Sequence, residues 1–427
     1  MLGGGTWITQ NKQIPGVYIN VVSKSRATAE MADRGVAAMA LELDWSGEAI
    51  VRVDAEDFFR NSEKLFGYPY THEKLWKLRE LFLGAKTVYV KRLNLTGAKK
   101  ARNEYAEAKY LGVRGNDLSV RVAPDAEVEG GFVVSTYLEG RRVDVQRVTK
   151  AAELKDNDFV VFTKAAELKA SAGLPLAGGS NGTVDGAAHQ AFLTELETYS
   201  FNTLGCSATD EVTKKLYRQY TIRLNEDVGA KFQLVVAGLF DSDHECVIGV
   251  GNSPELVYWV TGQTAGCAIN KTLTAKKYDG ERAVPCKETQ AELIASKREG
   301  KFLFHRVGDE IQVLQDVNTF TSHTDEKNED FQFNQVVRVV HQECVDIANV
   351  FAKKYLGKVP NDADGRVSLW ADIVKLNQEY ERLRAIQNFD EQLVKVEQGE
   401  SKRAVVANLP ITPTMAMEQL YLAIVVV

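Results

Sequence analysis

Cysteine is scarce in this sequence, and none of its spacings is one that metal sites or redox pairs use. Five cysteines are spread over 427 residues, and no two of them are separated by only two residues. An odd number of widely spaced cysteines is typical of reduced proteins and speaks against a disulfide framework or a zinc site. We therefore expect free thiols.

Long hydrophobic runs and strong charge of one sign are also missing. Residues 1–15 contain no apolar stretch of the kind found in a signal peptide. The run 420–427 is far shorter than the roughly twenty residues that span a bilayer, so no membrane insertion is expected. The formal net charge is −6, whereas a nucleic-acid-binding surface needs a basic stripe. We expect no nucleic-acid partner.

Motifs for catalysis and cofactor binding are incomplete. Residues 249–254 begin like a dinucleotide-binding turn but have Pro254 at the third glycine position. Residues 178–182 lack the Gly-Lys-Ser/Thr that completes a phosphate-binding loop, and we interpret them as a flexible hinge. Residues 241–246 collect possible metal ligands but lack the glycine and distal Glu of a calcium loop. We predict no catalytic residue, metal or cofactor; an enzyme whose site forms only in space stays an alternative.

The most distinctive feature is the apolar end of the chain. From residue 420 onward, both sets of alternate positions are apolar, and many of the side chains are β-branched. Such a run belongs in the middle of a sheet, yet the chain stops there without a return strand. Either its own sheet closes around this strand or another subunit supplies a neighbour. The residues concerned are Leu420, Tyr421, Leu422, Ile424 and Val426.

A second strand candidate lies near the beginning of the chain. Val17, Ile19 and Val21 alternate, with Tyr18 between them, directly after a Pro-Gly pair. Two strand-like termini indicate a protein that pairs with copies of itself. We predict that both termini exchange strands between subunits.

Between the termini the pattern changes several times. Helical and strand patterns alternate at first, then short strands and glycine turns follow one another, and the alternation resumes near residue 187. We predict a multidomain α/β and α+β protein, in which an α/β domain carries an inserted small β-sandwich or barrel. The expected parts are an arm at 1–22, the α/β domain at 23–94 and 187–315, the insert at 95–186, and an α+β assembly domain at 316–427.

Six short segments are distinctive: 15–19 (PGVYI), 109–118 (KYLGVRGNDL), 176–182 (LAGGSNG), 316–321 (DVNTFT), 355–361 (YLGKVPN) and 417–421 (MEQLY). These segments resemble the sheath protein of contractile phage tails. They occur in the family's order along nearly the whole chain, and the resemblance is poorest at about 120–170. The most similar relatives would be sheaths of phages, defective prophages and tailocins of Gram-positive bacteria.

The resemblance implies a structural subunit. Sheath subunits form six-fold rings that stack into a helical sheath around a tail tube, between a baseplate and a tail terminator. Contraction of the sheath drives the tube through a cell envelope. The expected partners are therefore copies of this chain and those tail proteins, and the expected location is a virion tail or tailocin particle made in the host cytoplasm. A sheath-like subunit of a related injection or secretion machine is the alternative.

Overall fold

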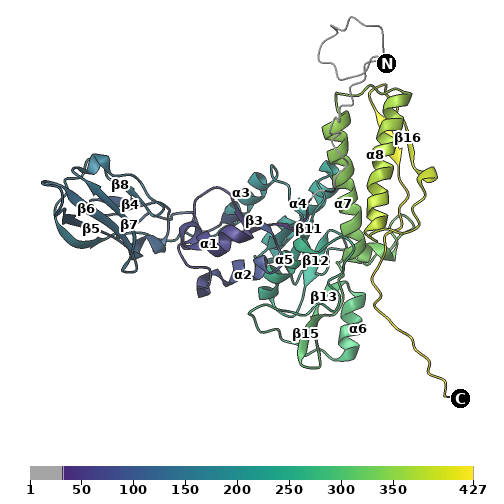
Figure 1. The fold of residues 1–427 in the computed structure, drawn as a ribbon. Coiled ribbons are helices and arrows are strands. Elements are labelled where there is room, and N and C mark those ends of the chain that lie inside the picture. Colours follow the sequence, from purple (N-terminus) through teal and green to yellow (C-terminus); the bar gives the residue numbers. More distant parts are fainter. Residues whose placement is uncertain (1–30, 32, 427) are drawn as a thin grey trace, which may run out of the picture.

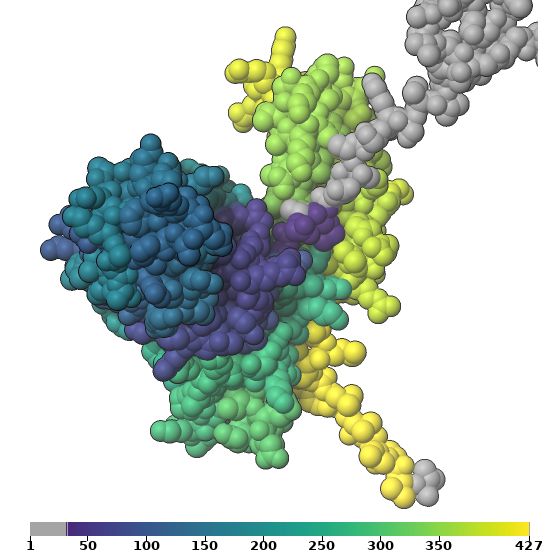
Figure 2. Space-filling model, turned by 60° about the vertical axis from the view of Figure 1, so that its left-hand side comes forward, coloured from purple at the N-terminus to yellow at the C-terminus, as the bar shows by residue number. Residues whose placement is uncertain are grey.

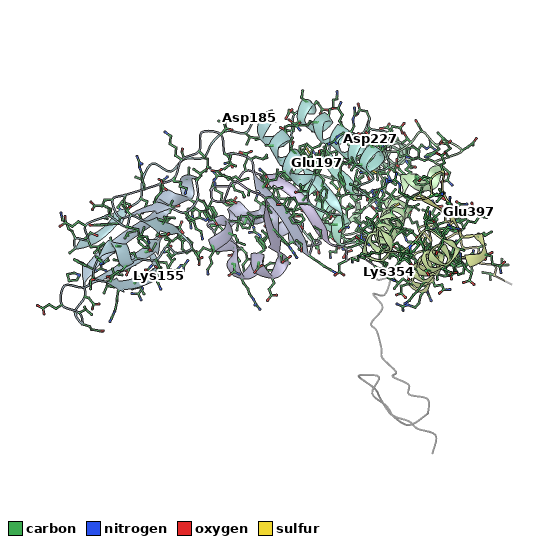
Figure 3. The ribbon with its side chains drawn as sticks, turned by 90° about the horizontal axis from the view of Figure 1, so that it is seen from above. Lys155, Asp185, Glu197, Asp227, Lys354 and Glu397 are labelled. Atoms are coloured by element: carbon green, nitrogen blue, oxygen red, sulfur yellow. The ribbon has the colours of Figure 1, made fainter. Side chains whose placement is uncertain are left out.

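The structure is a computed structural model that describes residue 31 and residues 33–426. Three bodies follow one another across the molecule (Figure 1): a β domain at one end, a central sheet covered by helices, and a helix pair with a hairpin at the other end. Figure 3 shows the same row from above, with Lys155 in the β domain and Lys354 and Glu397 in the helix pair and hairpin.

The central body is built on a seven-stranded sheet in the order β13-β12-β11-β10-β1-β3-β2, parallel except for the edge strand β2. Its strands are β1 (Val36–Leu41), β2 (Val51–Asp54), β3 (Thr87–Arg92), β10 (Thr203–Cys206), β11 (Gln233–Ala237), β12 (Val247–Val250) and β13 (Lys301–Phe302). Its helices are α1 (Ala55–Phe66), α2 (Trp76–Phe82), α3 (Gly186–Leu196), α4 (Glu211–Arg223), α5 (Val257–Gly266) and α6 (Gln290–Arg298), and a hairpin of β14 (Phe304–Val307) and β15 (Glu310–Val313) follows.

Strand β1 has two apolar faces because helices cover the sheet on both sides. Ala37 and Met39 face α1, α2 and α5, whereas Ala38 and Ala40 face α3 and α4. All four side chains are almost completely buried. The expected alternation of helices and strands thus yields a doubly covered parallel sheet.

Helix ends follow local signals in part. Gly67 ends α1 in the left-handed conformation, and the Asp210 side chain caps α4 by accepting a hydrogen bond from the Thr213 N–H. Asp54 precedes α1 as expected, but its carboxylate accepts a hydrogen bond from the Thr87 hydroxyl (2.5 Å) and leaves the helix uncapped. Long-range contacts therefore override the local cap at that position.

The β domain contains a four-stranded antiparallel sheet, β7-β6-β5-β9, and a two-stranded sheet, β4-β8. Its apolar core includes Val120, Val134 and Phe162. The strands are β4 (Ala106–Ala108), β5 (Leu118–Pro124), β6 (Phe132–Leu138), β7 (Arg141–Val148), β8 (Val160–Phe162) and β9 (Ser171–Pro175).

The junction between the β domain and the central body is densely hydrogen-bonded. The Asn181 amide donates to Asp44 Oδ1 (2.7 Å), and its carbonyl oxygen accepts from Arg92 Nη2 (3.0 Å) and from the Val113 N–H (3.2 Å). The buried Arg114 donates to the Gly67 carbonyl (2.6 Å). The glycine-rich stretch at 178–182 is therefore a connection held by hydrogen bonds to both bodies, and the expectation of a flexible hinge there is wrong.

The third body consists of two long helices and a hairpin. The helices α7 (Asn334–Val350) and α8 (Ala363–Arg382) pack side by side, and a π-helical turn at Phe351–Tyr355 ends the first one. The hairpin of β16 (Lys395–Gln398) and β17 (Val405–Asn408) lies against them through Val394, Val396 and Val405. None of the helices in the described part of the chain combines the length and apolar character that crossing a membrane requires.

Candidate assembly surfaces

The end of the chain lies along the folded body and then leaves it. Residues 412–414 run beside residues 385–387, with hydrogen bonds from the Gln387 N–H to the Thr412 carbonyl and from the Thr414 N–H to the Ala385 carbonyl (both 2.9 Å). Further along, the Ala416 N–H donates to Gln335 Oε1 (3.2 Å). Glu418 is the last residue for which a hydrogen bond to the rest of the body is recorded.

The terminal residues predicted to exchange strands are exposed. Between 72% and 92% of the surface of Leu420, Tyr421, Leu422, Ile424 and Val426 is accessible to solvent. They form no strand with any other described residue, and the space-filling view shows the tail standing clear of the body (Figure 2). The sheets formed by the described residues therefore do not enclose this segment. The other predicted residues, Val17, Tyr18, Ile19 and Val21, lie outside the described residues.

The β16–β17 hairpin presents unpaired edges. It forms a sheet of only two strands, and no further strand of the described chain pairs with either of them. Val396 and Val405 face the helices, whereas Val406 is 58% exposed. A two-stranded sheet with open edges is a ready template for additional strands.

The tail points away from this hairpin. In Figure 1, β16 lies beside the upper part of α8, and the tail leaves below the lower end of that helix. The contacts of Glu418 are with Thr274 and Gln315, which belong to the central part of the chain. Within the described part of the chain, the tail and this hairpin therefore do not pair with each other.

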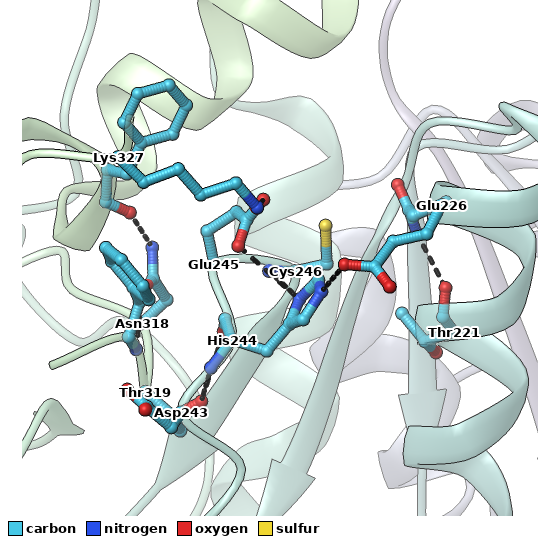
Figure 4. A network of polar contacts seen from close by, with 12 residues as sticks. Thr221, Glu226, Asp243, His244, Glu245, Cys246, Asn318, Thr319 and Lys327 are labelled. Carbon is cyan, nitrogen blue, oxygen red and sulfur yellow. Dashed lines mark hydrogen bonds and ion pairs between the residues drawn. The ribbon is translucent and has the colours of Figure 1, made fainter. Parts of the chain in front are cut away.

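In the cluster of possible metal ligands at 241–246, the atoms that could bind a metal form hydrogen bonds or ion pairs within the protein (Figure 4). Among the described residues, His244, Glu245 and Cys246 bring one ligand atom each within 4.8 Å of one another. However, His244 Nδ1 accepts the Cys246 N–H (3.1 Å), its Nε2 lies 3.2 Å from Glu226 Oε1, and Glu245 accepts from Lys327 Nζ (2.6 Å). The cluster thus holds the segment at 318–327 against the central sheet.

A buried cysteine and histidine next to this cluster do not form a catalytic pair. Cys246 Sγ lies 3.6 Å from His341 Nε2. Burial raises the pKa of the Cys246 thiol and lowers the pKa of His341 to about 3. A nucleophilic pair needs a thiolate beside a proton-accepting imidazole, so these shifts are in the wrong direction for catalysis.

The turn at 249–254 is also structural. Asn252 has a positive φ of 58°, its amide donates to the Pro285 carbonyl (2.9 Å), and its side-chain oxygen accepts the Phe304 N–H (2.7 Å). A side chain at Gly251 would collide with Leu303. The second glycine therefore serves close packing between the turn and its neighbouring loop.

A buried acid on α7 pairs with an amide on α8. Asn377 Nδ2 donates to Glu343 Oε1 (2.8 Å), while Glu343 Oε2 and Asn377 Oδ1 are buried and have no hydrogen-bond partner among the described residues. Burial, together with the nearby Asp346, raises the pKa of Glu343 to about 7. A protonated Glu343 places a donor on Oε2, which an ionised carboxylate lacks.

Three family models match successive parts of the chain. They are the phage tail sheath protein beta-sandwich domain at 95–181, the phage tail sheath protein central domain at 182–319 and the phage tail sheath C-terminal domain at 326–427. The crystal structure of a sheath tail protein from Desulfitobacterium hafniense is 32% identical, covers 93% of this chain and 96% of its own, and superposes with a TM-score of 0.83.

This chain belongs to the phage tail sheath family. The protein XkdK of the phage-like element PBSX in Bacillus subtilis is 28% identical over 98% of this chain and 99% of its own length. The helical sheath of the anti-feeding prophage in its contracted state covers 97% of this chain and 99% of its own at 11% identity, with a TM-score of 0.57, and shares the fold. Sheath proteins are structural components of phage or prophage tail particles, so the chain is not an enzyme.

The sequence drew attention to the tail through its two apolar faces, without saying whether its own subunit covers it. Sequence reasoning missed the contacts that fix the tail's starting point, because Glu418 and its partners Thr274 and Gln315 are far apart in sequence. It also missed the Glu343–Asn377 pair, since a Glu in an amphipathic helix is usually solvated. For the Glu418 contacts, the one feature of the sequence that drew attention to this position was the motif MEQLY at 417–421, which contains Glu418.

Proposed function

We propose that the chain is a subunit of a contractile tail sheath that assembles by exchanging terminal strands. Residues 420–426 of one subunit, and Val17, Tyr18, Ile19 and Val21 of another, add strands to the β16–β17 hairpin of a third. The observation that carries this proposal is an apolar tail, exposed over its whole length, in a molecule whose hairpin has open edges. Backbone hydrogen bonds would supply affinity and the alternate side chains specificity.

The energetics favour assembly only when many contacts add up. Burying one Leu, Ile or Val side chain contributes roughly 1.5–3 kcal/mol, while ordering each backbone residue costs about 1–2 kcal/mol. The net contribution of one arm is therefore small, and isolated subunits stay soluble at low concentration. In a lattice the contribution recurs at every contact, so assembly depends steeply on concentration.

The wider proposal is that six-fold rings of subunits stack around a tail tube, between a baseplate and a terminator, and contract to drive the tube through a cell envelope. The arms would act as tethers while the subunits rotate as rigid bodies. The bonded junctions between the bodies support this proposal, because they favour motion of whole subunits over bending inside them. No observation favours an injection or secretion machine over a tail.

Electron microscopy of the purified protein tests the proposal. We expect hollow tubes from the unmodified chain and a folded monomer from Ile424→Asp, with circular dichroism and sedimentation reporting folding and assembly separately. Val212→Asp is the matched control, because Val212 is as exposed as Ile424 (both 80%) and lies in the first turn of α4, where an acid is tolerated. Normal tubes from Ile424→Asp would contradict strand exchange by the tail.

A further inference from the structure

The root of the N-terminal arm, by which we mean residues 34–36, is held at the joint between the central body and α7. Arg34, just before β1, donates from Nε to the Cys267 carbonyl (3.1 Å), from Nη2 to the Thr264 carbonyl (3.5 Å) and from Nη1 to Gln342 Oε1 (3.3 Å). The first two carbonyls lie at the end of α5 and the third acceptor on α7. One side chain thus connects the beginning of the chain to both bodies.

The root of the C-terminal arm is held at the same joint. Glu418 accepts hydrogen bonds from the Thr274 hydroxyl (2.7 Å) and from Gln315 Nε2 (2.5 Å). Residue Ala416 donates its N–H to Gln335 on α7 (3.2 Å). The Glu418 carboxylate therefore fixes the point from which residues 419–426 leave the body.

A buried ion pair lies between the two roots. Arg338 on α7 and Asp316 are both almost completely buried and lie 3.0 Å apart. Asp316 also accepts the Leu273 N–H (3.0 Å), and its own N–H donates to the Thr274 hydroxyl (3.0 Å) that binds Glu418. At the root of the N-terminal arm, burial and the nearby Arg338 guanidinium lower the pKa of Arg34.

These contacts form one continuous polar connection. It runs from Arg34 to Cys267, whose thiol shares the Lys271 carbonyl with Arg338 Nη1 (3.6 and 3.0 Å). From Arg338 it continues through Asp316 and Thr274 to Glu418. The Arg338–Asp316 pair in the middle is buried, whereas the Thr274–Glu418 bond at one end is exposed. Linked hydrogen bonds polarise one another most strongly where they are buried, so the pair in the middle can carry a change at one end to the other. Because the ion pair sits between two bodies, its arrangement also fixes how those bodies meet.

We propose that this joint is a shared anchor that couples the roots of the two arms, so that ordering one arm on a neighbouring subunit tightens the root of the other. The inference rests on the proposed function, in which both termini are assembly arms. It adds that each subunit passes the state of one lattice contact to the next through Asp316 and Arg338. Coupling of this kind is reciprocal, so it has to be visible from either end.

Hydrogen exchange in the full-length monomer, below the concentration of assembly, tests the coupling. Arg34→Met removes the guanidinium at one root, and the Ala416 amide reports on the other. Thr274→Val removes the hydroxyl that binds Glu418 while keeping the side chain's shape, and the Gly35 and Val36 amides, which donate to Asn202 Oδ1 (both 3.0 Å), report on the far root. We expect each variant to speed exchange at the far root about fivefold or more.

Two control variants carry the same chemical changes elsewhere. Arg366→Met alters an arginine in the first turn of α8, and Thr412→Val alters a threonine of the tail whose backbone carbonyl makes the contact with Gln387. Arg366→Met should leave exchange of the Ala416 amide unchanged, and Thr412→Val should leave exchange of the Gly35 and Val36 amides unchanged. If Arg34→Met or Thr274→Val changes only its own root, with circular dichroism showing an intact fold, the shared anchor is overturned.

The two proposals fail in different measurements. Exchange at the roots is measured on monomers and does not depend on tube formation. Unchanged far-root exchange alongside normal tubes would reject the anchor and leave strand exchange standing. Coupled exchange in a protein that never forms tubes would reject the assembly proposal alone.

Discussion

Two segments of this molecule are apolar on both faces, but one is buried in the fold and the other is exposed to solvent. Strand β1 lies between β3 and β10 with helices on both sides, and its residues Ala37 to Leu41 are at most 1% exposed. The tail at 420–426 has the same kind of pattern and is at least 72% exposed at its five predicted strand positions. A two-faced apolar pattern therefore identifies a central strand without saying which chain provides its neighbours.

The largest expected effect comes from a charge placed in β1. Ala38 is fully buried against α3 and α4, so Ala38→Asp would bury an unpaired carboxylate. We expect a loss of about 4 kcal/mol or more of folding free energy, which is enough to prevent folding. Solubility and circular dichroism of the expressed protein measure this, and a stable Ala38→Asp monomer would contradict the buried position of β1.

The strands of the β domain pair with one another, and removing this domain tests whether the rest of the chain needs it to fold and to form tubes. We propose that 95–186 folds as a separate domain; replacing 97–180 with a short Gly/Ser linker keeps Asn181 and the helix cap Asp185. We expect the remaining chain to fold and form tubes, with stability lower by about 3 kcal/mol because Trp45 and Tyr68 lose their cover. Thermal unfolding and microscopy report the outcome, and an unfolded remainder would show that the insert is integral.

The Glu343–Asn377 pair predicts a smaller, pH-dependent effect inside the helix pair. Because the folded-state pKa of Glu343 is raised from 4.5 to about 7, the pair's stabilisation is complete below pH 4.5 and is lost as pH rises through 7. Asp346, which accepts from the Tyr380 hydroxyl (2.7 Å), adds negative charge nearby. Glu343→Gln supplies a neutral donor at every pH.

We therefore expect Glu343→Gln to raise stability by about 1–3 kcal/mol at pH 8 and by much less at pH 5. Denaturant unfolding at the two pH values measures the difference. Asp372→Asn changes an acid on α8, the helix that carries Asn377, but one bound to Lys354 and Tyr355; it is the control and should not reproduce this pH dependence. An equal effect of Glu343→Gln at both pH values would contradict a protonated Glu343.

The smallest expected effect is that of Ile424→Asp on the monomer itself. The exposed tail contributes nothing to the fold of its own subunit, so the free energy of unfolding should change by less than about 0.5 kcal/mol. The same substitution is predicted above to abolish tubes, and this contrast with Ala38→Asp separates the two apolar segments. A strongly destabilised Ile424→Asp monomer would place the tail in its own subunit's core.

The sequence predicted those parts of the fold that depend on neighbouring residues. The β-branched run at β3, the left-handed Gly67 and the capping Asp210 follow from local pattern and conformation. The error at 178–182 arose because glycine indicates conformational freedom, whereas the bonds of Asn181 to Asp44 and Arg92 come from distant parts of the chain. The Glu418 contacts were out of reach for the same reason, and the assignment of the terminal strands stays a prediction.

The direction of the tail has a consequence for mixtures of subunits. The tail leaves on the side away from its own hairpin. In the proposed assembly, the donor strand and the acceptor hairpin of one chain are therefore separate functions. A subunit truncated after Gln419 keeps its acceptor hairpin but offers no terminal strand. Small amounts of it added to intact protein would occupy growing ends without extending them, and tube length would fall with the fraction of truncated chains. The truncated subunit would thus act as a dominant chain terminator and a means of setting the length of the polymer.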